Sequence, residues 1–132
     1  MTAGMTLILD SGGISALAGH RARLTELRRR GLWPPQVPAV TLAESLTGDH
    51  RRDHDTNRLV RTCQIRDVDE LISREAARLR TSTGRAAKIS AVDAIVVAFA
   101  GTYPEPVVLT TDPRDLGTLA DHATTPITIA KT

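Results

Sequence analysis

The most apolar segment of the chain is Ala91–Ala100, AVDAIVVAFA, and it contains a single carboxylate, Asp93. With Ser90 at its start, the segment is expected to form an apolar helix. Burying an unpaired charge costs several kcal/mol, so a carboxylate in such a segment needs a partner. An arginine, a helix N-terminus or a metal ion can serve, and each implies a different role for the protein.

On both sides of this segment, short apolar runs alternate with helical patterns. Strands are expected at residues 6–9, 37–40, 64–66, 107–110 and 126–130. Helices are expected at residues 14–18, 21–32, 41–47, 56–62, 69–80 and 113–120, and from Ser90 onward. This alternation predicts an α/β fold, a three-layer sandwich in which helices cover both faces of a mostly parallel five-strand sheet. At 132 residues, the chain is expected to be one domain spanning residues 1–132.

Composition narrows the class of protein. Aromatic residues make up 2% of the chain, which predicts an aliphatic core and argues against RNA-binding modules that stack bases on aromatic platforms. Fifteen of the seventeen basic residues are arginine, which suits phosphate contacts and is equally typical of a GC-rich genome. A single cysteine, Cys63, excludes an internal disulfide and indicates a reducing compartment. No apolar run approaches the ~20 residues of a membrane span, so a cytoplasmic protein without a membrane partner is expected.

Four acids follow strand ends or lie in the first turn of the next helix: Asp10, Glu44, Asp93 and Asp112. In a parallel sheet these positions meet at one edge, where ligands bind. Helix capping is the alternative for each acid alone. Glu44 and Asp93 fit the capping-box pattern, Asp112 precedes a proline that can begin a helix, and Asp10 can stabilise a turn.

Capping does not explain why all four acids would gather at one edge. Two carboxylates ~5 Å apart repel by roughly 3 kcal/mol at an effective dielectric constant near 20, and these motifs contain no lysine or arginine partner. An all-oxygen ligand set favours Mg²⁺, for which Mn²⁺ can substitute. Asp115 either joins this cluster or acts as the reciprocal cap of the helix that begins near Asp112. A second cluster, with His50 and His54 four residues apart, is interpreted as a solvated loop rather than a zinc site.

Four segments together resemble the PIN domain and, within it, the VapC toxins of bacterial toxin–antitoxin pairs. They are LILDSGGISAL (7–17), VPAVTLAES (37–45), ISAVDAIVVAFA (89–100) and VVLTTDPRDLGTLA (107–120), in the order and spacing of that family. The resemblance covers nearly the whole chain. The chain departs from it at Gly12-Gly13, where many members carry a bulkier residue.

The resemblance implies a Mg²⁺-dependent endoribonuclease in which a metal-activated water cleaves RNA and leaves a 3′-hydroxyl and a 5′-phosphate. The catalytic acids would be Asp10, Glu44, Asp93 and Asp112, with Asp10 and Asp93 as direct metal ligands. Ser11 and Thr110 would support the site, and Arg85, Lys88 and Arg114 are candidates for holding RNA. Asp115 is a further supporting candidate from its position in the sequence and not from the resemblance. The implied partners are a VapB-type antitoxin and a second copy of the chain in a homodimer.

Other functions remain open from the residues alone. A phosphatase with a nucleophilic aspartate would need a second aspartate where Gly12 stands, and a receiver domain would need a lysine better placed than Lys131. A non-catalytic PIN-like binding module is disfavoured because all four acids are present. A housekeeping PIN nuclease without an antitoxin is the remaining alternative.

Overall fold

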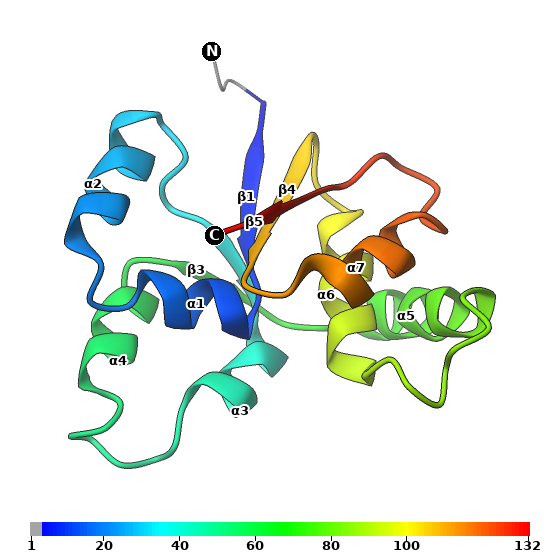
Figure 1. Ribbon diagram of the computed structural model, residues 1–132, viewed down its shortest axis with the longest axis horizontal. Helices are drawn as coiled ribbons and strands as arrows, with labels where there is room; N and C mark the ends of the chain where they lie inside the picture. Colours follow the sequence, from blue (N-terminus) through cyan, green and yellow to red (C-terminus); the bar gives the residue numbers. More distant parts are fainter. Residues whose placement is uncertain (1–3) are drawn as a thin grey trace.

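The computed structural model describes residues 4–132, which form a central sheet with helices on both faces (Figure 1). The strands are β1 (Thr6–Leu9), β2 (Gln36–Pro38), β3 (Gln64–Arg66), β4 (Pro106–Thr110) and β5 (Thr128–Lys131). Their order across the sheet is β3-β2-β1-β4-β5, and every neighbouring pair is parallel. The predicted α/β class and five-strand sheet are therefore confirmed.

Side chains of the central strand β1 alternate between two hydrophobic cores. Ile8 faces the core formed with α5 (Glu70–Ser82), α6 (Ala91–Ala100) and α7 (Pro113–Ala120). Leu7 and Leu9 face the core formed with α1 (Ser11–Leu17), α2 (Arg21–Arg29) and α4 (His54–Val60). Figure 1 shows these two groups of helices on opposite sides of the sheet. The cores are aliphatic apart from Phe99, as the composition predicts.

Several element boundaries differ from the sequence expectations. The helix expected from residue 14 begins at Ser11, because the Asp10 side chain caps it. The strand expected over residues 37–40 ends at Pro38 and passes into a 3₁₀ turn (Ala39–Thr41) and the short helix α3 (Leu42–Ser45). The Thr41 hydroxyl donates a 2.9 Å hydrogen bond to the Pro38 carbonyl, which stabilises this early turn. The turn brings α3 close to α1 at the carboxyl edge of the sheet.

The two glycines that depart from the family pattern lie where α1 packs closely against the end of β4. A Cβ atom on Gly12 would lie 2.6 Å from the Thr111 hydroxyl, and one on Gly13 would overlap the Leu109 carbonyl oxygen. Glycine at these positions therefore lets the start of α1 approach β4 without a steric clash.

No helix in residues 4–132 is long and apolar enough to cross a membrane.

Candidate active site

Asp10 lies at the end of β1 and is held in place by two hydrogen bonds. Its side chain is 7% exposed. The backbone N–H of Gly13 donates to its Oδ1 atom at 2.7 Å, and the Thr110 hydroxyl donates to its Oδ2 atom at 2.7 Å. Each carboxylate oxygen keeps a further lone pair for another partner. Asp10 therefore caps α1 and is also fixed in orientation at the carboxyl edge of the sheet.

Glu44 reaches this edge from α3. Its Oε1 atom accepts a 3.2 Å hydrogen bond from the Ser11 hydroxyl, the first residue of α1. The capping box considered as the alternative for residues 41–44 is not formed, because the Thr41 side chain makes no cap hydrogen bond. Glu44 is thus directed toward the residues that follow β1 rather than back along its own helix.

Asp93 lies in the first turn of α6 and is half-buried. The Ser90 hydroxyl accepts a 3.0 Å hydrogen bond from its backbone N–H, so the cap expected at Ser90 is present. No arginine or lysine of residues 4–132 forms an ion pair with its carboxylate. An arginine, a helix N-terminus and a metal ion were the three partners considered for Asp93, and the arginine is not found among residues 4–132.

Electrostatics shows which acids surround Asp93. Burial, and to a smaller extent the charges of Asp10, Glu44 and Asp115, together raise the pKa of Asp93 to about 6, against the lowering effect of the hydrogen bond with Ser90. Carboxylates from the residue that follows β1, from α3 and from α7 therefore act on Asp93 across the carboxyl edge of the sheet. We call Asp10, Glu44, Asp93 and Asp115 the acidic cluster.

Asp112 lies beside the acidic cluster, because its backbone N–H donates a 3.2 Å hydrogen bond to the Thr110 hydroxyl, which itself donates to Asp10. It is exposed, and its side chain accepts a 3.3 Å hydrogen bond from the backbone N–H of Arg114, which caps α7. It is not among the carboxylates whose charge raises the pKa of Asp93. Asp115, one turn further along α7, is half-buried and is among them. The charge of Asp115 thus acts on Asp93, while the Asp112 side chain caps α7.

The acidic cluster does not form a ready-made metal cage. Within residues 4–132, no three histidine, cysteine, aspartate or glutamate side chains are arranged so that they could hold a metal ion as they stand. His50 and His54 form no such group either: His50 lies in a turn, and His54 is the first residue of α4.

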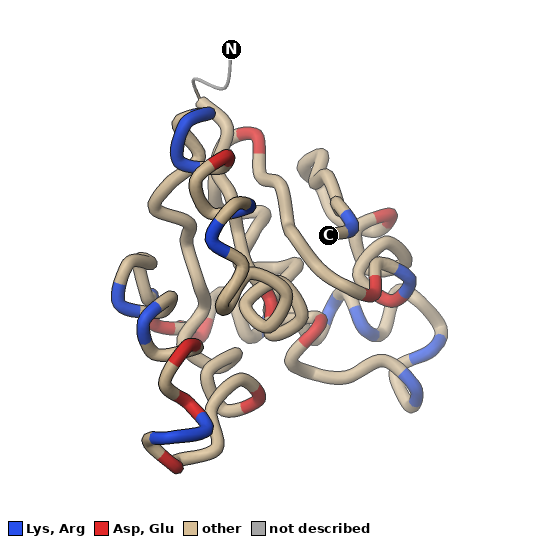
Figure 2. Tube along the Cα trace, turned by 60° about the vertical axis from the view of Figure 1, so that its left-hand side comes forward, with Lys and Arg blue, Asp and Glu red and all other residues tan. Residues whose placement is uncertain are grey.

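The three basic residues predicted to hold RNA are exposed on segments next to the acidic cluster. Arg85 and Lys88 lie in the loop that leads into α6, and Arg114 lies in the first turn of α7. Figure 2 shows lysine and arginine gathered in short clusters on the outer helices and loops.

Two residues that support this region were missed by the sequence analysis. Arg80 donates hydrogen bonds to the carbonyls of Ala86 (2.7 Å) and Ile89 (2.9 Å), which fixes the loop before α6. Asp53 is buried and accepts hydrogen bonds from Thr47 and Gly48. Burial raises the pKa of Asp53, but these hydrogen bonds outweigh it and hold the value below its ordinary range. A charged side chain that bonds backbone atoms of a nearby loop leaves no periodic signal in a sequence.

Solved structures similar to this chain share its fold across nearly its whole length. A chain in the crystal structure of DNA-bound VapBC from Salmonella typhimurium superimposes with a TM-score of 0.72 at 15% identity, covering 96% of this chain and 98% of that one. Residues 4–132 of this protein therefore have a PIN-like fold. A chain of VapBC2 from Rickettsia felis, bound to a promoter DNA fragment, has a TM-score of 0.69 at 12% identity. The match covers 97% of this chain and 99% of that one. A chain of FitAcB from Neisseria gonorrhoeae has a TM-score of 0.66 at 16% identity. The match covers 95% of this chain and 96% of that one.

The PIN-like fold is recognised from structure and not from overall sequence similarity. Comparison of the sequence with protein-family models and with curated proteins found no match. At identities of 12–16%, the likeness establishes the fold alone.

Proposed function

We propose that this chain is a divalent-cation-dependent endoribonuclease that acts as the toxin of a toxin–antitoxin pair. One observation carries the proposal: Asp93 is half-buried among three other carboxylates, and no basic side chain of residues 4–132 neutralises it. Like charges held together in this way are stabilised by a bound cation. The PIN-like fold shared with VapBC and FitAB structures supports the same function.

The donor set fits Mg²⁺ or Mn²⁺. All four side chains of the acidic cluster offer oxygen atoms, which these hard cations prefer. Mg²⁺ usually keeps several waters and is held by one or two carboxylates. The absence of a three-ligand cage in residues 4–132 is compatible with that mode. We infer that Asp10 and Asp93 hold the cation directly, while Glu44 and Asp115 act on its waters.

In the proposed reaction the cation would activate the water, and the chain orients the acidic side chains. When bound, the cation would lower the pKa of a coordinated water and neutralise charge on the phosphorane-like transition state. The chain supplies orientation: Gly13 and Thr110 fix the Asp10 carboxylate, and Ser11 fixes Glu44. The expected products of such cleavage are a 3′-hydroxyl and a 5′-phosphate.

The direct test is metal-dependent cleavage of RNA by the purified protein. Cleavage is expected with Mg²⁺ or Mn²⁺ and should stop with EDTA. Asp10→Ala should lower the rate at least about 100-fold, since removing a metal ligand loses several kcal/mol of transition-state stabilisation. Asp67→Asn, an exposed acid outside the cluster, is the control and should retain the wild-type rate. Undiminished cleavage in excess EDTA would contradict the proposal.

The partner of the proposed toxin is a small antitoxin of the VapB type, encoded beside it. We infer that its inhibitory tail carries arginine or lysine, because a cation pointed at the acidic cluster can displace the metal. Expression of this chain alone is expected to arrest bacterial growth, and co-expression of the neighbouring small gene should restore growth through a stable complex. Growth curves and co-purification measure both effects. If expression without an antitoxin is harmless in the native host, a non-catalytic module or a housekeeping nuclease replaces the toxin assignment.

The homodimer stays a prediction. Leu71 on α5 is 78% exposed, but a single exposed apolar side chain does not by itself mark an interface.

A further inference from the structure

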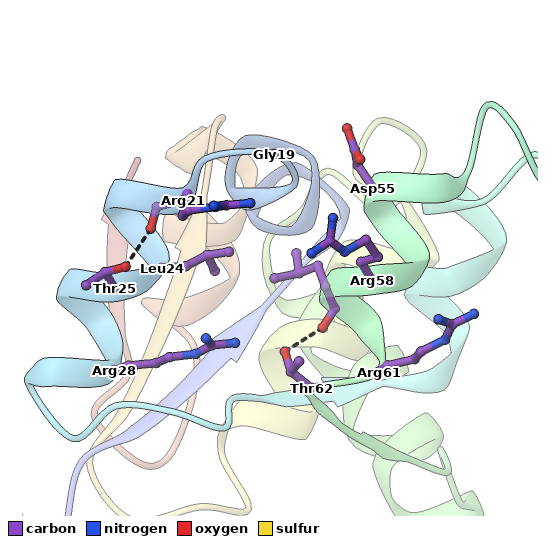
Figure 3. A pocket seen from close by; sticks show the side chains of 10 residues that line it. Gly19, Arg21, Leu24, Thr25, Arg28, Asp55, Arg58, Arg61 and Thr62 are labelled. Carbon is purple, nitrogen blue, oxygen red and sulfur yellow. Dashed lines mark hydrogen bonds between the residues drawn. The ribbon is translucent and has the colours of Figure 1, made fainter.

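A cavity of about 780 Å³ lies between α2 and α4, on the side of the sheet that α1 covers. Four arginines line it: Arg21 and Arg28 from α2, and Arg58 and Arg61 from the end of α4. Figure 3 shows Arg21, Arg28 and Arg58 directed into the space between the two helices, whereas Arg61 extends away from α2. We call this cavity the arginine groove.

The positive charge of the arginine groove is not neutralised from within. In the described part of the chain, Arg21, Arg58 and Arg61 form no ion pair with a carboxylate. Arg28 lies over the Trp33 ring, 5.6 Å from its centroid, which leaves its hydrogen-bond donors available. Asp55 is the single acid that lines the groove, and its Oδ1 atom is 3.1 Å from Nδ1 of His54.

The arginine groove is connected to the acidic cluster by one short helix. α1 has seven residues and begins at Ser11, next to Asp10. It ends at Leu17, two residues before Gly19, which lines the groove. Seven helical residues span only about 10 Å, so a flexible polyanion at the acidic cluster can reach the groove within a few of its repeating units.

The side chains of the groove suit phosphate groups better than a peptide. Guanidinium groups bind phosphate oxygens through paired hydrogen bonds, and two turns of α2, about 10 Å, separate Arg21 from Arg28. An acidic peptide helix would need apolar anchor sites in the groove. Leu59 is 4% exposed and Leu24 is half-buried, so neither leucine of the groove is an open anchor site.

We propose that the arginine groove binds the phosphodiester backbone of single-stranded RNA, at nucleotides adjacent to the one positioned at the acidic cluster. The choice of RNA rests on the proposed function, whereas the preference for phosphate rests on the groove itself. Arg21, Arg28 and Arg58 contact phosphates, and the groove holds the substrate without reading its sequence.

The test is the binding of a fluorescein-labelled, mixed-sequence 20-nucleotide RNA, followed by anisotropy in EDTA so that no metal-dependent cleavage occurs. The double variant R21Q/R58Q should bind at least about tenfold more weakly at 0.1 M salt, and the slope of log K against log salt should become shallower by about 1.4. The control double variant R23Q/R51Q removes two exposed arginines outside the groove and should change the slope less. If the double variant fails to fold, R21Q alone decides, with an expected slope change of about 0.7.

The outcomes separate this proposal from the proposed function. Wild-type affinity and slope in R21Q/R58Q would overturn the groove assignment even if RNA is cleaved. RNA binding that depends on Arg21 and Arg58, without cleavage in Mg²⁺ or Mn²⁺, would uphold the groove and contradict the nuclease. Binding of labelled oligoglutamate that depends on these arginines, with RNA binding unaffected, would overturn the proposal in favour of an acidic protein partner.

Discussion

Asp93→Asn is expected to lower RNA cleavage at least about 100-fold and, in EDTA, to raise the melting temperature of the protein at pH 7.5. The amide keeps the volume of the carboxylate but is a weaker ligand for a hard cation. It also carries no charge, so it removes the repulsion from Asp10, Glu44 and Asp115. A residue that is needed for activity and costs stability belongs to a functional site rather than to the scaffold.

The gain in stability should depend on pH. The pKa of Asp93 is about 6 in the folded protein, because burial and neighbouring carboxylates disfavour its charged form, and about 3.9 in an unfolded chain. The folded state therefore binds more protons between these values, and wild-type stability falls as pH rises from about 3.9 to about 6. Asparagine escapes this loss. Solvent screening of a half-exposed group keeps the gain to a few degrees at pH 7.5, and it should shrink at pH 4.5.

Thermal unfolding of wild type and Asp93→Asn in EDTA at the two pH values measures this effect, with Asp67→Asn as the matched exposed control. Added Mg²⁺ should then raise the melting temperature of the wild type and not that of the variant, because only the wild type keeps the site. A variant that melts well below the wild type at pH 7.5 would show that Asp93 is mainly structural.

The strands and their order of appearance were predictable because apolar runs such as Thr6–Leu9 alternate with amphipathic helices. The end of β2 was not, because the turn depends on the Thr41 hydroxyl and the Pro38 carbonyl. A serine, threonine or aspartate beside a helix start has several local hydrogen-bonding choices, and tertiary packing selects among them.

The acidic edge was predictable in outline because parallel strands bring their carboxyl ends together. The geometry at Glu44 was less so, since its partner is Ser11, thirty-three residues away in the sequence. The arginine groove was not predictable at all. Arg21 and Arg58 come from different helices, and only the packing of α2 and α4 around α1 turns them toward one cavity.

The choice between Asp112 and Asp115 shows the limit most clearly. Both acids belong to the segment TTDPRDLG, and both suit the start of a helix that begins with a proline. Positions three residues apart lie on the same face of a regular helix. Asp112, however, precedes α7 with an extended backbone (φ −129°, ψ 95°), so helical periodicity does not give the direction of its side chain. In the structure the Asp112 side chain caps α7, and the charge of Asp115 raises the pKa of Asp93.

Asp115→Asn is therefore expected to lower RNA cleavage roughly 10- to 100-fold, the usual cost of losing a group that orients metal ligands and waters. Asp112→Asn should stay near the wild-type rate, because asparagine caps a helix about as well as aspartate. Asp112→Ala should also keep its activity but lose about 1 kcal/mol of stability with the cap.

Carboxyl carbon NMR of the metal-free protein gives a readout that a merely structural role for Asp115 would not affect. Removing the Asp115 charge should lower the pKa of Asp93 below about 6, because one of the like charges that raise it is gone. Asp112→Asn should leave that pKa unchanged. The reverse pattern, with activity and the Asp93 titration depending on Asp112 and not on Asp115, would return the fourth acidic position to Asp112 and restrict Asp115 to the first turn of α7.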